Sequence, residues 1–258
     1  MPFITLTSDH GLKDFTVSSI KGAIYKECPN AVVTDITHLV PKFDIAQSAF
    51  IVRNAYPDFP EGTIHILGVM PDESPNTPHV AVFCNGHYFI GADNGIFSLL
   101  FDKMPDKIVE LNISPTARFV KPIRDIFVKA ACHIARGGTM EVIGKTRERI
   151  NEKAMFRAVV DDNTIRGTVI YVDNYGNVIS NISETLFKEV GKGRSFTISF
   201  RVPGYDIHHI SKSYTDVPQS EKLALFGMTG FLEIAINVGN ASHLLGLHLN
   251  DIVRIEFE

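Results

Sequence analysis

The pattern of apolar residues changes near Thr164, and this change limits the folds that the chain can adopt. Before it, short apolar runs typical of β-strands alternate with segments whose apolar residues recur at helical spacing. The runs cover residues 3–7, 32–36, 63–69, 80–84 and 107–111, and the helical segments cover 14–28, 44–55 and 124–136. Strands that alternate with helices predict a mostly parallel sheet with helices on both faces.

After Thr164 the apolar runs are short, and few helical segments separate them. They cover residues 168–172, 178–179, 195–200, 223–226, 232–236 and 252–257. Many short strands at this spacing, divided by turn residues, predict a small antiparallel barrel or sandwich. The chain is therefore predicted to form an α/β domain over residues 1–160 and an antiparallel β-barrel-like domain over residues 165–258.

Composition excludes several classes of protein. The 258 residues are 45% hydrophobic with a formal net charge of −4, and no run of lysine or arginine supplies the basic surface typical of nucleic-acid binding. No apolar run is long enough to span a membrane, and the first residues lack a signal-peptide pattern. Cys28, Cys84 and Cys132 show no metal-binding spacing, so we expect reduced core cysteines in a cytoplasmic protein without a metal site.

Three polar segments are candidates for ligand binding. In residues 7–14, Asp9 follows a strand, where a carboxylate either accepts hydrogen bonds from a sugar diol or caps a turn. Asp173 and Asn177 lie in a hairpin turn, a structural role that does not exclude contact with a ligand. Residues 229–247 contain an apolar strand that ends in a polar turn, whose backbone groups can contact a flat base.

A fourth segment, residues 68–82, is a polar loop with three prolines between two apolar runs. Ligands of α/β proteins bind just beyond the carboxyl ends of the strands, so this loop is either the floor of a site or only a long connection. No GxGxxG, GxxxxGK[ST], HExxH or GxSxG motif is present, which leaves dinucleotide, P-loop, zinc-protease and serine-hydrolase sites unsupported. The residues alone predict a two-domain protein that binds a small polar ligand between its domains.

Seven segments, in order along nearly the whole chain, carry a family resemblance. They are TSDHGLKDFTVSSIKG, CPNAVVTDITHLVPKFDIAQSAF, FPEGTIHILGV, GADNGIFS, RDIF, VDNYGNVISNI and GFLEIAINVGNAS. Together they resemble the S-adenosylmethionine (SAM) hydroxide adenosyltransferases and the related fluorinase and chlorinase. The resemblance implies a homotrimer that holds SAM between the first domain of one subunit and the second domain of its neighbour. It also implies that water or hydroxide displaces methionine from the 5′ carbon of SAM, giving adenosine and L-methionine without a cofactor.

The resemblance assigns roles around the sugar and the reacting carbon. Asp9 is similar to the carboxylate that binds the ribose hydroxyls, since a carboxylate offers two acceptors to two neighbouring O–H donors. Phe43 resembles an aromatic residue that lines the ribose pocket, and Met70 falls among the substrate-binding residues. The Asp, Arg and His that position water in the family fall here on Met70, Thr77 and Pro122. The chain is therefore identified as a divergent member that lacks the usual water-handling set.

The resemblance also assigns roles in the second domain. Asp173 is similar to the residue that pairs with the ammonium group of methionine. Asn177 resembles the amide that reads the edge of adenine, and Tyr214 resembles the aromatic residue stacked on the base. Asn237 and Val238 match a segment whose backbone contacts adenine.

The altered water site leaves the activity open. Asp72, Glu73 and His79 lie in the same loop region and are candidate replacements, although loop charges are ordinarily solvated. Ile123 falls where a halogenase offers a hydroxyl to halide, so halide chemistry is not supported. The resemblance predicts a SAM hydrolase; the alternatives are a non-catalytic protein that binds SAM or adenosine as a sensor or sequestering module, and an enzyme that uses another nucleophile.

Overall fold

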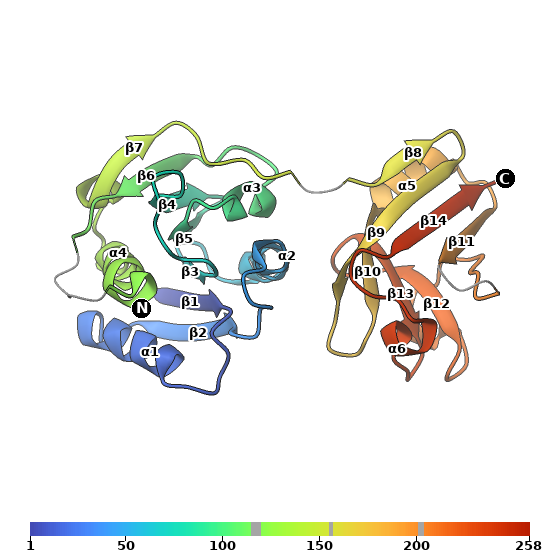
Figure 1. Ribbon diagram of the computed structural model, residues 1–258, viewed down its shortest axis with the longest axis horizontal. Coiled ribbons are helices and arrows are strands. Elements are labelled where there is room, and N and C mark those ends of the chain that lie inside the picture. Colours follow the sequence, from blue (N-terminus) through green and yellow to red (C-terminus); the bar gives the residue numbers. More distant parts are fainter. Residues whose placement is uncertain (115–119, 155–156, 201–203) are drawn as a thin grey trace. The chain divides into compact units, whose positions relative to one another are not determined.

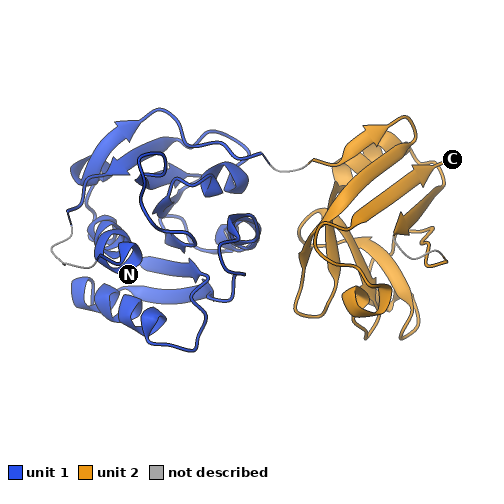
Figure 2. Cartoon of the chain, viewed as in Figure 1, with its two compact units in different colours: residues 1–155 blue, residues 156–258 orange. Residues whose placement is uncertain are grey.

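The chain forms two units, residues 1–155 and 156–258, each built around its own sheet (Figures 1 and 2). The computed structural model describes residues 1–114, 120–154, 157–200 and 204–258. Each unit encloses separate buried clusters of apolar side chains, so each has the core that a domain requires.

The first unit contains a mixed sheet in the order β2-β1-β3-β5-β4-β6-β7. Its strands are β1 (Phe3–Ser8), β2 (Val32–Thr37), β3 (Ile64–Gly68), β4 (His79–Cys84), β5 (His87–Ala92), β6 (Lys107–Leu111) and β7 (Gly144–Arg147). Neighbours from β2 to β5 pair in parallel, whereas β4 pairs antiparallel with both β5 and β6, and β6 pairs antiparallel with β7. Half of the sheet is thus antiparallel, which corrects the prediction of a mostly parallel one.

The β4–β5 hairpin is the physical reason for the mixed sheet. Asn85 and Gly86 connect the two strands with φ angles of 51° and 80°. Two consecutive residues of positive φ form the tight turn whose twist matches a hairpin, and Asn-Gly is a preferred sequence for it. The second arm, β5, is one of two strands of this sheet that the sequence interpretation missed; the other is β7.

Helices cover both faces of this sheet, as predicted. They are α1 (Thr16–Glu27), α2 (Ile45–Ala55), α3 (Ile96–Leu100) and α4 (Val128–Ala135), with short turns η1 (Tyr56–Asp58), η2 (Ile123–Phe127) and η3 (Met140–Ile143). Buried residues of α1 and α4 share one apolar cluster with the sheet, and those of α2 and α3 share the other. Asp44 caps α2 by accepting a hydrogen bond from the Gln47 N–H, which fixes the predicted start of that helix.

The second unit contains an antiparallel sheet in the order β11-β14-β9-β10-β13-β12, with β8 paired to β9, and Figure 1 shows that it curls. Its strands are β8 (Val159–Asp161), β9 (Thr164–Val172), β10 (Val178–Ser183), β11 (Phe196–Phe200), β12 (Lys222–Phe226), β13 (Phe231–Ile236) and β14 (Ile252–Phe257). The antiparallel pairing agrees with the prediction. Three short elements were not predicted in full, namely α5 (Glu184–Gly191), η4 (Tyr214–Asp216) and α6 (Ala241–Leu245).

Cys28, Cys84 and Cys132 are buried and free, as expected of core cysteines. Over the described residues, no helix combines the length and the apolar character needed to cross a membrane. Nor does any group of three or more His, Cys, Asp or Glu side chains in that part of the chain lie close enough together to bind a metal ion.

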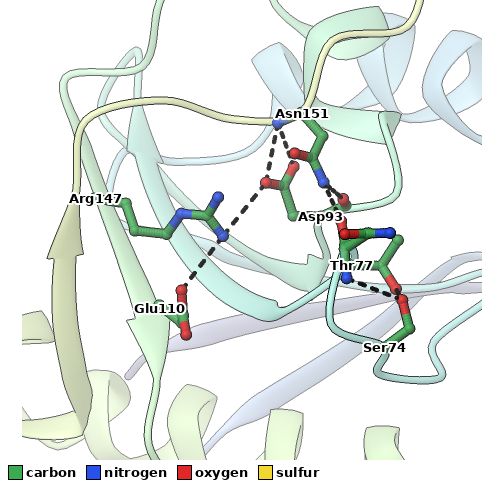
Figure 3. Close-up of polar contacts among 7 residues, drawn as sticks. Ser74, Thr77, Asp93, Glu110, Arg147 and Asn151 are labelled. Carbon is green, nitrogen blue, oxygen red and sulfur yellow. Dashed lines mark hydrogen bonds and ion pairs between the residues drawn. The ribbon is translucent and has the colours of Figure 1, made fainter.

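A buried carboxylate fixes the end of the first unit (Figure 3). Asp93, which follows β5, has no exposed surface, and the backbone N–H of Asn151 donates to both of its carboxylate oxygens at 3.0 Å. Burial raises the pKa of Asp93, and this effect outweighs the opposing Asn151 hydrogen bond and the charge of Arg147. Asn151 Nδ2 also donates to the Asn76 carbonyl, so one residue joins the chain leaving β7 to the loop after β3.

Asp93→Ala is expected to lower the free energy of unfolding by about 1–3 kcal/mol, because it leaves the Asn151 N–H without its acceptor. Glu110→Ala is the matched control, since Glu110 is an exposed carboxylate that lies 3.4 Å from the same Arg147. An exposed pair of this kind contributes about 0–1 kcal/mol. Urea titrations of both variants measure the difference, and equal losses would contradict this role for Asp93.

Candidate functional site

The first candidate residue, Asp9, lies at the carboxyl end of β1, between strands β2 and β3. Its side chain is 9% exposed, and the backbone N–H of Phe43 donates to its Oδ2 over 2.9 Å. Phe43 itself is 70% exposed and has a φ of 65°, so its ring is not part of the core. The structure therefore brings together the two residues predicted to contact a sugar, 34 positions apart in sequence.

Asp9 and Phe43 line a pocket of about 690 Å³ in the first unit, a volume within the usual range for small-molecule sites. Met70, Thr77 and Pro122, the positions that correspond to the expected water-handling set, all line the same pocket. The loop after β3 therefore forms part of the pocket wall and is more than a connection.

The end of β3 packs closely against a pocket residue. At Gly68 a Cβ atom would lie 2.5 Å from Ile123 Cδ1 and 3.3 Å from Ser8 Cβ, so any side chain there would have to displace the end of the Ile123 side chain. Ile123 opens η2, a single turn of π-helix, and both Ile123 and Arg124 line the pocket. Single π-helical turns within helices occur frequently at functional sites. Arg124 pairs with Asp125 through two hydrogen bonds of 2.7 and 3.0 Å.

Two residues at the pocket have strained backbones. Phe43 and Met70 have φ angles of 65° and 47°, a region that bulky side chains rarely adopt. The Met70 carbonyl accepts a hydrogen bond of 3.1 Å from Asn94 Nδ2, and Asn94 also lines the pocket. Such strain costs about 1–3 kcal/mol per residue and is concentrated at functional sites. Sequence reasoning did not single out Asn94, although it lies within the segment GADNGIFS.

The three candidate catalytic residues of the loop have different positions. Asp72 is exposed and lines the pocket, whereas Glu73 is exposed and does not line it. His79 is buried at the start of β4, where its Nε2 donates to the Pro71 carbonyl at 2.8 Å and its ring packs edge-on against Phe127. The structure therefore brings Asp72, but neither Glu73 nor His79, to the pocket.

In the second unit, Asp173 and Asn177 bond to each other. Asp173 Oδ1 accepts from the Asn177 backbone N–H at 2.8 Å, and Asp173 Oδ2 accepts from Asn177 Nδ2 at 3.0 Å. Asn177 is 6% exposed. These contacts stabilise the predicted turn, and they fix the orientation of both side chains.

Tyr214 bonds to a residue that sequence reasoning missed. Its hydroxyl donates to Oε1 of Glu233, a buried residue in β13, over 2.5 Å. Burial raises the pKa of Glu233, the negative charge of Asp173 acts in the same direction, and the Tyr214 hydrogen bond opposes both. An acidic residue inside the apolar strand FLEIAI was the signal that could have identified it.

Asn237 and Val238 follow the same strand. The N–H of Asn237 donates to the Glu221 carbonyl, and its own carbonyl accepts from the Ser220 N–H, at 3.0 and 2.8 Å. Val238 has a φ of 54° and is 80% exposed. The Asn237 backbone therefore holds the β12–β13 end together, while Val238 presents an exposed, strained backbone.

Comparisons with known proteins agree with this arrangement. The N-terminal domain model of the SAM hydroxide adenosyltransferases matches residues 4–144, and the C-terminal domain model matches residues 167–254. A protein from Thermus thermophilus named (R)-S-adenosyl-L-methionine hydrolase is 30% identical, with 96% of this chain and 97% of that protein covered. One of the same name from Salinispora tropica is 28% identical, with 98% and 97% covered.

The fold comparison extends over the same length. The crystal structure of an uncharacterized conserved protein from Thermotoga maritima superposes with a TM-score of 0.87 at 27% identity, and covers 98% of this chain and 99% of that one. Both domain models match in the expected order and together span most of the chain. The chain belongs to the SAM hydroxide adenosyltransferase family.

Proposed function

We propose that the protein is a SAM hydrolase: water displaces methionine from the 5′ carbon of SAM and leaves adenosine and L-methionine. The observation that carries this proposal is the position of Asp9 in the 690 Å³ pocket, in a chain 30% identical to a named SAM hydrolase. Asp9 Oδ2 is held by the Phe43 N–H. In this proposal its carboxylate accepts hydrogen bonds from the two ribose hydroxyls, which fixes the sugar.

The reaction requires little chemical activation by the protein. Sulfonium leaves as a neutral thioether, so we propose that no cofactor takes part. The remaining tasks are to align water behind the carbon–sulfur bond and to remove other water from the pocket. Alignment alone supplies up to about 7–11 kcal/mol of a displacement barrier. Apolar pocket residues such as Met70, Pro122 and Ile123 suit the exclusion of bulk water.

We further propose that the second unit binds the remainder of the ligand. In this proposal Asp173 pairs with the ammonium group of methionine, Asn177 and the Val238 backbone contact adenine, and Tyr214 stacks on the base. Tyr214 is 42% exposed while its hydroxyl is held by Glu233, an arrangement that supports an aromatic surface fixed for stacking.

A homotrimer is part of the proposal. Large apolar side chains that are more than 60% exposed occur on both units, which supports their burial in an assembly. They include Leu12, Phe15, Leu39 and Phe43 in the first unit and Tyr175, Met228, Val238 and Leu244 in the second. Sedimentation velocity of the purified protein distinguishes a trimer from a monomer.

Incubation of the purified protein with SAM tests the proposed function. We expect adenosine and methionine to appear in equal amounts by chromatography, and SAM to disappear at the same rate. Replacement of the usual water-handling set at Met70, Thr77 and Pro122 favours one second candidate, a protein that binds SAM or adenosine without turnover. Calorimetric binding of SAM without products would identify that alternative, and binding of neither compound would refute the assignment of the ligand.

A further inference from the structure

His10 places an imidazole in the pocket of the first unit, where it was not singled out from the sequence. Its side chain is 28% exposed, so it is neither buried in the core nor free in solvent. The Nδ1 atom lies 3.9 Å from Asp9 Oδ1. Within the described residues, His10 Nε2 has no hydrogen-bond partner, which leaves this atom available to a ligand or to water.

The segment that carries His10 is fixed by His38. His38 is 3% exposed, and its Nδ1 lies 2.7 Å from Ser8 Oγ, while its carbonyl accepts from the Gly11 N–H at 2.7 Å. The His10 N–H in turn donates to Ser8 Oγ at 3.4 Å. His38 thus holds the backbone on both sides of Asp9 and His10.

Asp35 lies beside the other ring nitrogen of His38, and Lys21 pairs with Asp35. His38 Nε2 lies 3.1 Å from Asp35 Oδ1, and Lys21 Nζ lies 2.6 Å from Asp35 Oδ2. Burial raises the pKa of Asp35, but the Lys21 hydrogen bond and the nearby His38 outweigh this effect and lower the pKa. An ionised Asp35 favours the His38 tautomer with its proton on Nε2, so Nδ1 accepts from the Ser8 hydroxyl. His10 is therefore presented from an ordered backbone.

The other titratable groups of the pocket are less suited to accept a proton. Asp9 already accepts a hydrogen bond from Phe43, and Arg124 is paired with Asp125. Lys42 and Lys121 are cations at neutral pH. Asp72 is an exposed carboxylate, and carboxylates are weak bases near neutral pH. A general base works best when its pKa lies near the operating pH, a condition that imidazole meets as a class.

We propose that His10 is the general base of the displacement, an inference that rests on the proposed function. As the water oxygen forms its bond to the 5′ carbon, the carbon–sulfur bond breaks and its electron pair leaves with the sulfur of methionine. The proton of the attacking water passes to His10 Nε2. The Asp9 carboxylate, 3.9 Å from Nδ1, stabilises the imidazolium. Because the side chain is partly exposed, the proton then returns to solvent.

Several charged groups lie beside His10 or line the same pocket. Asp9 lies beside it, and Asp14 interacts with it electrostatically. The pocket adds Asp72 and the cations Lys42, Lys121 and Arg124. Protonation of the imidazole removes the base, so kcat is expected to fall on acidification.

His10→Gln tests the proposal through kcat and its pH profile. We expect kcat to fall by about 10²–10⁴-fold, KM to change by less than about threefold, and the acid limb of the kcat profile to disappear. Added imidazole is expected to restore part of the rate in His10→Ala. His248→Gln, an exposed histidine of the second unit, is the matched control and should retain wild-type kinetics.

The possible outcomes distinguish a failure of the His10 proposal from a failure of the proposed SAM hydrolase function on which it rests. If the wild-type protein hydrolyses SAM and His10→Gln keeps both its kcat and its acid limb, the proposal is overturned while the proposed function stands. The same holds if Asp72→Asn loses kcat and His10→Gln does not. If the wild-type protein forms no adenosine, both fail. Retained adenosine binding by His10→Gln shows that a loss of rate is not a loss of fold.

Discussion

Asp9→Ala is expected to lower kcat/KM for SAM by about 10²–10⁴-fold. In the proposed function, the substitution removes hydrogen bonds between a carboxylate and two ribose hydroxyls, each worth about 1.5–3 kcal/mol when one partner is charged. It also removes the acceptor of the Phe43 N–H, which loosens a second pocket residue. Because the proposed ribose contact would be made in both the bound substrate and the transition state, most of the loss should appear in KM.

Two further variants test whether the loss in Asp9→Ala is specific to the Asp9 carboxylate. Asp9→Asn keeps one carbonyl acceptor and should give an intermediate loss. Asp58→Ala removes an exposed carboxylate that does not line the pocket, and its kinetics should match the wild type. Steady-state assays of adenosine formation measure all three variants. A kcat/KM for Asp9→Ala within threefold of the wild-type value would show that this carboxylate does not hold the substrate.

Acidification from pH 7 to pH 5 is expected to lower the free energy of unfolding by about 2 kcal/mol. His65, in β3, is fully buried, with Nδ1 at 2.7 Å from Thr5 Oγ1 and Nε2 at 3.2 Å from His87 Nδ1. Burial, followed by the neighbouring His87, lowers the pKa of His65 to about 3. Burial lowers the pKa of His87 as well.

The sign of the effect follows from which state binds protons first. An unfolded histidine takes up a proton near pH 6.5, whereas folded His65 stays neutral down to about pH 3. The stabilisation is therefore complete above pH 6.5 and is lost progressively as the pH falls toward 3.

Urea titrations at both pH values test this prediction. His65→Gln replaces the buried imidazole with a group that does not titrate, and should remove most of the pH dependence. His248→Gln removes an exposed imidazole and should leave the wild-type dependence unchanged. An equal loss of stability in wild-type protein and His65→Gln would assign the acid sensitivity to other groups.

Local sequence patterns predicted the helices and strands better than they predicted which strands pair and in which direction. Asp44 marks the start of α2 because its capping contact lies within three residues. The strand β5 escaped prediction because its assignment depends on the Asn85-Gly86 turn, which returns the chain antiparallel to β4. Helix α1 begins at Thr16, after the predicted Asp14, because the Asp14 side chain accepts from the Thr16 N–H just before the first turn.

The candidate site is formed mainly by contacts between residues far apart in the sequence, which local sequence patterns do not predict. Asp9 and Phe43 were predicted through family resemblance, and their contact joins residues 34 apart. His79 looked like a loop histidine, but it is the first residue of β4 and packs against Phe127. Glu233 meets Tyr214 only because β13 and η4 fold together. No periodicity in the sequence encodes such contacts.

Turnover of SAM in oxygen-18-labelled water is the most direct test of the central claim, that water attacks the 5′ carbon of a ligand held by Asp9. We expect one heavy oxygen atom in the 5′-hydroxyl of each adenosine formed, and none in methionine, by mass spectrometry. Unlabelled adenosine, or cleavage of another carbon–sulfur bond that leaves the sulfur on the 5′ carbon, would contradict this expectation.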